Sequence, residues 1–262
     1  MRVEKRSLRY VNHIIVVSKG VSNILTRLAG KDLPHTIIGN GVDPDKLSPT
    51  VPPSKIREQL KIPANAPVLF FHGSFRPFHG VENLIRVFSL VKKRIPDAFL
   101  LLVGDGPTFK SCRKLAGDLE LLSNIRFTGF ISNESIANWI NIADICLYFP
   151  AIEVIKKEMQ DKRGYAGKPT KFIEYMIMRK PIITLECEDM IENVKEAGAG
   201  IFVKKPSYEE FASEIIKLLG EPERRRIMGE NARRYALANC TLERAVAKRV
   251  EIINSLLSRR PV

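Results

Sequence analysis

Short apolar runs alternate with segments of helical periodicity along most of the chain. Residues 68–72 read VLFFH, a continuous apolar run with the length of a buried strand. After a glycine-bounded loop, apolar residues recur at helical spacing from Val81 to Val91, and Pro96 follows the expected helix end. The same alternation predicts further strands at 99–103, 125–127, 145–149, 181–185 and 201–203, and helices at 109–119, 136–140, 170–178, 207–218, 221–237 and 242–258.

Strands that are apolar throughout and alternate with helices indicate a parallel sheet covered on both faces. We therefore expect an α/β fold with a doubly wound, Rossmann-like parallel sheet from about Pro67 to Ser258. Ligands of such sheets bind at the carboxyl ends of the strands, near the point where the strand order reverses. The loops that follow predicted strands should share that edge, namely 73–80, 104–107, 129–131 and 149–170.

The first part of the chain has a different pattern. Residues 12–18 (NHIIVVS) predict a strand, 21–28 a short helix, and 36–47 (TIIGNGVDPDKL) a strand that runs into a tight turn. This segment holds too little apolar material for a core of its own. We therefore divide the chain into residues 1–45, the end of another domain with its hinge, and residues 46–262, the main domain.

The charge of the chain favours an anionic partner. Lys and Arg number 42 against 29 Asp and Glu, which gives a formal net charge of +13. A phosphate-bearing ligand, an anionic membrane surface and nucleic acid are the candidate classes. No basic segment is interleaved with aromatic residues, so we expect no nucleic-acid partner. The basic residues are spread along the chain and are densest at 5–9, 156–171, 224–226 and 259–260.

Cysteine and histidine spacing gives no indication of a metal site. The four cysteines form no CxxC pair, and the four histidines lack the spacing of metal ligands. His72 lies in a predicted buried strand and is expected to be a satisfied core residue. The sequence MRVEKRSLRY has no apolar leader, and no stretch approaches the roughly 20 apolar residues of a membrane span. We expect a cytoplasmic protein, or one held peripherally on the cytoplasmic face of a membrane.

Several motifs occur in the order seen in one enzyme family. They are NHIIVVSKGVSNIL with IIGNGVDPDKL, FFHGSFRPFHGVENLI, FLLLVGDGP, IRFTGFI, ADICLYF and PTKFIEYMIMRKPIIT. In this order they resemble group 1 glycosyltransferases, which are retaining enzymes of the GT-B fold. The resemblance implies that residues 46–262 form the nucleotide-sugar-binding, C-terminal half of a GT-B fold. Residues 1–45 would be a remnant of the N-terminal acceptor domain and its hinge.

The loop from Gly73 to Gly80 is expected to contact the diphosphate of the donor. Relatives carry an Arg after the first glycine and a Lys before the second, where this chain has Ser74 and His79. Arg76, or His79 if protonated, would then supply the positive charge. The alternative is a plain strand-to-helix turn. By the same resemblance the nucleotide or sugar would contact Gly73, Gly104, Asp105, Gly106, Phe130 and Ile131.

Residues 169–174 (PTKFIE) start a predicted helix after a long loop. Free N–H groups and the helix dipole make such a start an anion site, to which Thr170 and Lys171 add a hydroxyl and a charge. Glu174 is four residues from Thr170 and therefore lies on the same helix face. By resemblance this carboxylate binds the ribose diol, whereas the alternative is a first-turn Glu that only complements the dipole.

The chain departs from the family pattern at one position. The family has two Glu eight residues apart, and counting back from Glu174 gives Ala166. Glu153 and Glu158 are candidates to replace the first Glu. No residue can be assigned as catalytic, and no metal cofactor is expected. The predicted reaction transfers sugar from a nucleotide-sugar to a glycan or lipid-linked acceptor with retention. The alternative is a non-catalytic nucleotide-sugar-binding module or subunit that needs a separate acceptor-domain partner. The candidate protein partners are an acceptor-domain subunit or a second copy of the chain, as a homodimer.

Overall fold

A parallel sheet forms the centre of the computed structural model, which describes residues 7–151 and 169–258. Its strand order is β5-β4-β3-β6-β7-β8, and every neighbouring pair is parallel. The expected α/β, doubly wound parallel sheet is thereby confirmed. The strands are β3 (Val68–His72), β4 (Phe99–Val103), β5 (Ile125–Phe127), β6 (Ile145–Tyr148), β7 (Ile182–Leu185) and β8 (Gly200–Val203).

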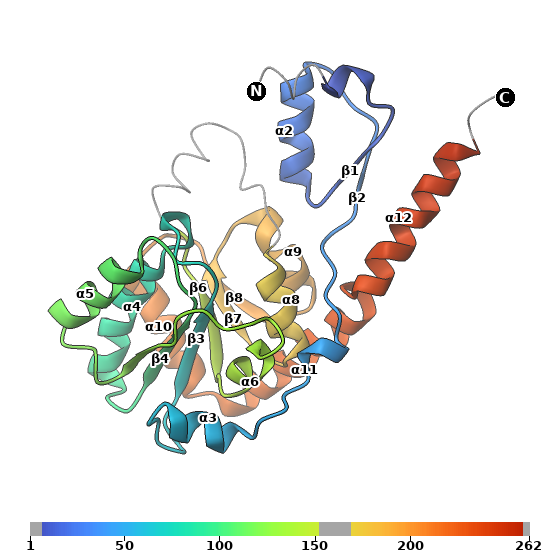
Figure 1. The fold of residues 1–262 in the computed structure, drawn as a ribbon. Helices are drawn as coiled ribbons and strands as arrows, with labels where there is room; N and C mark the ends of the chain where they lie inside the picture. The colour runs from blue at the N-terminus through green and yellow to red at the C-terminus, as the bar shows by residue number, and fades with distance from the viewer. Residues whose placement is uncertain (1–6, 152–168, 259–262) are drawn as a thin grey trace.

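Helices cover both faces of this sheet (Figure 1). On one face α4 (Val81–Arg94) packs against α5 (Phe109–Asp118) and α10 (Tyr208–Leu219). On the other, α11 (Pro222–Asn239) packs against α8 (Thr170–Ile177) and α9 (Glu188–Glu196). The strands are apolar throughout because both faces are buried: all of β4 and β6 is buried, as are the first four residues of β3.

The strand order reverses between β3 and β6. From β3 the chain moves outward through β4 to β5, returns through α6 (Ile136–Asn141) to β6, and continues outward to β7 and β8. The helix that follows β3, α4, and the next described helix after β6, α8, therefore lie on opposite faces of the sheet, and a crevice is expected between them at the carboxyl edge. This is the expected position of a ligand site.

Several short elements were not predicted from the sequence. They include α3 (Pro53–Gln59), the 3-10 turn η3 (Pro77–His79) and α9. The sequence of α9, EDMIENVKE, is mostly polar, but Met190, Ile191 and Val194 lie on one face of the helix and are buried. The burial of these side chains against the domain stabilises α9.

The N-terminal segment forms a small unit beside the sheet domain (Figure 1). After η1 (Leu8–Tyr10), β1 (Ile14–Val16) pairs in parallel with β2 (His35–Ile37), and α2 (Lys19–Ala29) connects them. The predicted strand and helix are thus present, although β1 is shorter than expected. Ser18 caps α2 by accepting a hydrogen bond from the Val21 N–H.

Backbone hydrogen bonds join this segment to the last helix, α12 (Leu242–Leu257). The N–H of Val42 donates to the Cys240 carbonyl, and the N–H of Leu242 donates to the Val42 carbonyl. A Cβ on Gly41 would lie 2.6 Å from the Thr241 carbonyl oxygen, so only glycine fits there. The chain then passes through η2 (Asp45–Leu47) to α3, while α12 extends away from the sheet domain (Figure 1).

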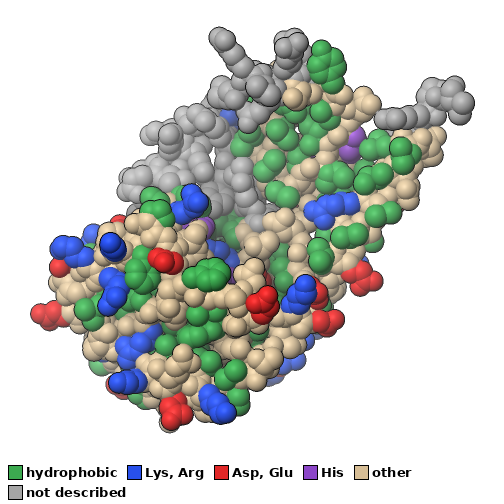
Figure 2. Space-filling model, in the orientation of Figure 1, with side chains coloured by type: hydrophobic (Ala, Val, Ile, Leu, Met, Phe, Trp, Pro, Cys, Tyr) green, Lys and Arg blue, Asp and Glu red, His purple; other side chains and the backbone are tan. Residues whose placement is uncertain are grey.

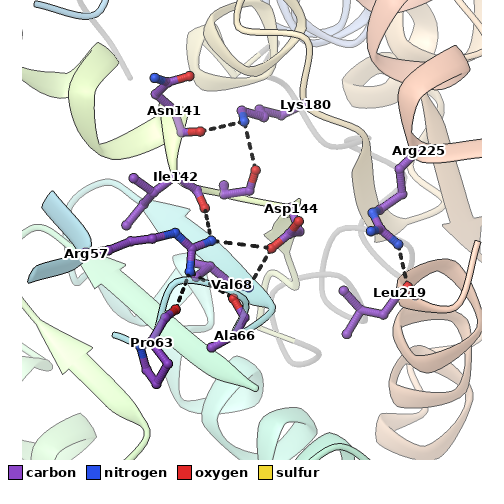
Figure 3. A network of polar contacts seen from close by, with 11 residues as sticks. Arg57, Pro63, Ala66, Val68, Asn141, Ile142, Asp144, Lys180, Leu219 and Arg225 are labelled. Carbon is purple, nitrogen blue, oxygen red and sulfur yellow. Dashed lines mark hydrogen bonds and ion pairs between the residues drawn. The ribbon is translucent and has the colours of Figure 1, made fainter. Parts of the chain in front are cut away.

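A polar network holds the amino edge of the sheet, opposite to the expected site (Figure 3). Asp144 accepts a hydrogen bond from the Val68 N–H at 2.8 Å, and Arg57 lies 4.0 Å from the same carboxylate oxygen. Lys180 donates to the carbonyls of Asn141 and Ala143. These cations are bonded within the fold, so they are structural and not available to an anionic ligand.

The remaining charges on the face drawn in Figure 2 are mixed in sign, with Lys, Arg, Asp and Glu side chains interspersed. Among residues 7–151 and 169–258, no helix has both the length and the apolar character needed to cross a membrane. The dense basic run at 156–168, and with it Glu153, Glu158 and Ala166, lies outside the described residues.

Candidate nucleotide-sugar site

Two adjoining pockets lie at the carboxyl edge of the sheet, beside the ends of β3 and β6, where the strand order reverses. They share His72, Gly73 and Asn133. The larger has a volume of about 440 Å³ and is also lined by Asn40, His79, Tyr148, Pro169, Thr170, Lys171 and Glu174. The smaller, of about 250 Å³, is also lined by Ser74, Val103, Gly104, Asp105, Phe130, Ile131 and Ile136.

The start of α8 opens into the larger pocket. Pro169 occupies the N-cap position and provides no side-chain hydrogen bond to the first turn. Thr170 is exposed and lines the pocket together with Lys171. The N–H groups of this turn therefore lack the side-chain acceptor that usually satisfies them, and with the helix dipole they favour an anion.

Lys171 is a buried cation without a hydrogen-bond partner. Its side chain is 8% exposed, and Nζ lies 4.5 Å from the centroid of the Phe71 ring and 5.0 Å from that of Tyr148. A Cβ on Gly73 would come within 2.6 Å of Nζ, so the ammonium lies directly beneath this loop. Burial lowers the pKa of Lys171 to about 7, against the opposing effect of Glu174. An anion in the pocket would reverse this penalty.

Glu174 is bonded to His72 across the pocket. His72 Nε2 and Glu174 Oε2 are 2.7 Å apart, and burial lowers the pKa of His72 although the carboxylate raises it. The imidazole is therefore neutral at pH 7, with its hydrogen on Nε2 facing the carboxylate. Its Nδ1 is buried without a partner. The prediction that His72 is a satisfied core residue is wrong, because the side chain lines both pockets.

Arg76 and His79, the two predicted sources of positive charge in the loop after β3, differ in whether they line a pocket. Arg76 is exposed and lines neither pocket. His79 lines the larger pocket, and its Nδ1 donates to the Ser74 carbonyl at 2.6 Å. Burial, followed by the charge of Lys171, lowers the pKa of His79 to about 4, so this imidazole is neutral at pH 7. Among the described residues, Lys171 is the cation that lines the larger pocket.

The glycines of the two loops have separate roles. A Cβ on Gly104 would lie 2.0 Å from the Gly73 carbonyl oxygen, so the loops after β3 and β4 touch backbone to backbone there. Both glycines line the smaller pocket. Gly80 and Gly106 line neither pocket and pack against the backbones of residues 149–151 and of Phe75. Asp105 lines the smaller pocket, and its carboxylate accepts a hydrogen bond from the Gly106 N–H.

Aromatic and amide side chains complete the two pockets. Phe130 is 79% exposed at the smaller pocket, where Ile131 also lies. Sequence reasoning missed Asn40, Asn133 and Tyr148, which come from three separate segments. Tyr148 lies within the strand predicted at 145–149, where a side chain is expected in the core. The loop carrying Asn40 is rich in glycine, which was the one available signal for a close approach of backbone to ligand.

Within the described residues, no three His, Cys, Asp or Glu side chains gather closely enough to hold a metal ion. The predicted diphosphate and ribose residues Thr170, Lys171 and Glu174 do come together, in the larger pocket with His79. Ser74, Gly104, Asp105, Phe130 and Ile131 come together in the smaller pocket, which Gly73 joins to the larger.

Comparison with known proteins gives consistent matches. An uncharacterized glycosyltransferase of Methanocaldococcus jannaschii is 27% identical over 259 residues, covering 98% of this chain and 62% of the relative. Alpha-D-kanosaminyltransferase of Streptomyces kanamyceticus is 26% identical over 192 residues, covering 73% of this chain and 46% of the relative. The chain thus spans between about half and two thirds of the length of these two relatives.

Solved structures show the same fold at lower identity. Sucrose-phosphate synthase of Thermosynechococcus elongatus matches with a TM-score of 0.79 and 23% identity, over 99% of this chain and 62% of that one. Anabaena HepE in complex with UDP and glucose matches with a TM-score of 0.82 and 20% identity, over 97% of this chain and 66% of that one. These likenesses establish a fold of the GT-B type.

The family described as "Glycosyl transferases group 1" matches residues 53–235, which contain the whole of both loops after β3 and β4 and the start of α8. This range covers well over half of the chain and every strand of the large sheet. The chain belongs to the group 1 glycosyltransferase family.

Proposed function

We propose that this chain is the donor-binding half of a glycosyltransferase that uses a nucleotide-sugar and retains the configuration of the sugar. One observation carries the proposal. The ammonium of Lys171, buried and without a hydrogen-bond partner, lies beside the uncapped start of α8 at the reversal point of the sheet. A buried unpaired cation is costly unless a ligand supplies the opposite charge, and a diphosphate is such a ligand.

The two pockets divide the donor between them. In the larger pocket, Lys171 and Thr170 would contact the diphosphate, and Glu174 would accept hydrogen bonds from the ribose diol. The smaller pocket, with Phe130 and Ile131 at its wall, continues from the larger through Gly73 and would hold the base or the sugar. The structurally similar Anabaena HepE has been solved in complex with UDP and with UDP-glucose, which supports a nucleotide-sugar as the ligand.

The chemistry required of this half is stabilisation of the leaving diphosphate. Negative charge develops on the diphosphate as the bond to the anomeric carbon breaks, and donors already in place lower that barrier. The N–H groups at the start of α8 and the Lys171 ammonium are such donors. The acceptor would be positioned by an acceptor-binding domain, in the same polypeptide or in a separate subunit.

The exposed face of α12 supports contact with that second domain. Leu242, Val246, Val250, Ile253 and Leu257 recur at helical spacing and are each 46–57% exposed. An apolar stripe of this kind normally lies against another element. We expect it to contact the acceptor-binding domain, and the acceptor itself to be a glycan or a lipid-linked sugar.

The proposal is tested by calorimetric titration with UDP, GDP and ADP, in the presence and absence of EDTA. One of the three should bind, with the same affinity in both conditions, because the positive charge comes from Lys171 and α8. Absence of binding to all three would contradict the proposed function. Binding that disappears with EDTA would contradict the assignment of the charge to Lys171.

A further inference from the structure

His72 holds one oxygen of Glu174 from the last position of β3. Its Nε2 lies 2.7 Å from Oε2, and the two side chains are 14% and 22% exposed. A carboxylate can only accept, so the imidazole donates. Among the described residues, no other hydrogen bond involves the Glu174 carboxylate, and its second oxygen is left for the pocket that both residues line.

Tyr175, the residue of α8 that follows Glu174, fixes the position of the His72 ring. The hydroxyl of Tyr175 accepts a hydrogen bond from the His72 backbone N–H at 3.1 Å, and the two rings pack edge to face with centroids 5.1 Å apart. The imidazole Nδ1 is buried without a partner. A proton there would have no acceptor, so the ring is held as a neutral donor whose one hydrogen faces Glu174.

Without this bond, Glu174 has a competing partner on its own helix. Lys171 is three residues earlier, a spacing at which side chains meet, and its buried ammonium is unpaired. An ion pair between them would neutralise the cation that serves the diphosphate and turn the carboxylate away from the ribose. The bond to His72 thus leaves Lys171 free to bind the diphosphate and Glu174 free to bind the ribose, although the two residues have opposite charge and lie on one helix turn.

We propose that His72 is a positioning residue that directs the Glu174 carboxylate at the ribose diol of the donor and keeps it from pairing with Lys171. This inference rests on the proposed function. Its consequence is specific, because discrimination between ribose and deoxyribose would depend on a histidine that does not itself bond the sugar. A residue that only filled space in the core would not affect this discrimination.

The experiment compares UDP, GDP and ADP with the 2′,3′-dideoxy form of each, by calorimetry. The wild type should bind the ribonucleotide about tenfold more tightly, which corresponds to about one hydrogen bond to a charged group. In His72→Leu the ratio should fall to about one to threefold, whereas His72→Gln, whose amide can reach Glu174, should keep it. His35→Leu, at an exposed histidine outside both pockets, is the matched control and should leave the ratio unchanged.

Each outcome separates the inference from the function on which it rests. If the wild type discriminates and His72→Leu discriminates equally, the inference is wrong while the proposed function stands. If the wild type binds both forms equally, Glu174 does not read the ribose and the inference is also wrong. If no nucleoside diphosphate binds, the proposed function itself fails. Should His72→Leu not fold, His72→Asn, whose amide is too short to reach Glu174, replaces it with the same expectation.

Discussion

Replacing Lys171 by methionine should stabilise the empty protein and weaken donor binding at the same time. Burial lowers the pKa of this lysine from 10.5 to about 7. At about 1.36 kcal/mol per pH unit, this shift corresponds to roughly 5 kcal/mol of penalty on the charged form. The penalty on folding is fully present below pH 7, where lysine is charged in both states, and fades as the pH rises toward 10.5.

Methionine keeps the contacts with the rings of Phe71 and Tyr148 but carries no charge. In the wild type, the contacts of the ammonium with those two rings offset part of the penalty. We therefore expect the free energy of unfolding of Lys171→Met to exceed that of the wild type by about 1–3 kcal/mol at pH 7. Affinity for a nucleoside diphosphate should fall by about 10- to 100-fold, because a charge-assisted hydrogen bond is lost in a buried place. Urea unfolding and calorimetric titration measure the two effects on the same samples.

A half-buried lysine, Lys180, gives the matched control. Lys180 donates to the carbonyls of Asn141 and Ala143 at the amino edge, away from both pockets. Lys180→Met should therefore destabilise the fold by about 1–3 kcal/mol, since two carbonyls lose their donor, and should leave affinity unchanged. The reasoning is refuted if Lys171→Met destabilises the protein as Lys180→Met does while binding nucleotide as tightly as the wild type.

Three further predictions concern the same groups. A bound diphosphate raises the pKa of Lys171 above about 7, so binding at pH 8 should take up close to one proton, measured as the dependence of the calorimetric heat on buffer ionisation. Nucleotide affinity should be highest below pH 7 and decline above it. Binding without proton uptake would exclude Lys171 from the site. Glu174→Ala should weaken nucleotide binding by about 1–3 kcal/mol, with a loss of stability of about 1 kcal/mol from the unpaired His72 donor; unchanged affinity in titrations would leave this residue a purely structural role. Asp144→Ala should lower the free energy of unfolding by about 1–3 kcal/mol, because the Val68 N–H loses its acceptor, without changing affinity; a loss of binding would show that the two edges of the sheet are not independent.

The sheet could be predicted from the sequence because its strands are continuous apolar runs separated by helical periodicity. The same reasoning failed for α9, where Met190, Ile191 and Val194 are the buried positions of a polar segment. Three apolar positions on one face of a short, mostly polar segment are a weak local signal, and the stability of such a helix comes from burial against the domain.

The candidate site was predicted in part. Lys171 and Glu174 could be located because a helix start after a strand is an anion site, and because the motif resembles a known family. His72 could not, since a histidine in an apolar strand is most often a core residue. Its bond to Glu174 follows from the packing of α8 beside β3, which only the folded chain reveals.

The position of a bound diphosphate tests the central claim most directly. A crystal structure with whichever of UDP, GDP or ADP binds should show diphosphate oxygens within hydrogen-bond distance of Lys171 Nζ and of the N–H groups at the start of α8, with the ribose hydroxyls on Glu174. The account is contradicted if the diphosphate lies elsewhere and Lys171 stays buried without a partner in the complex.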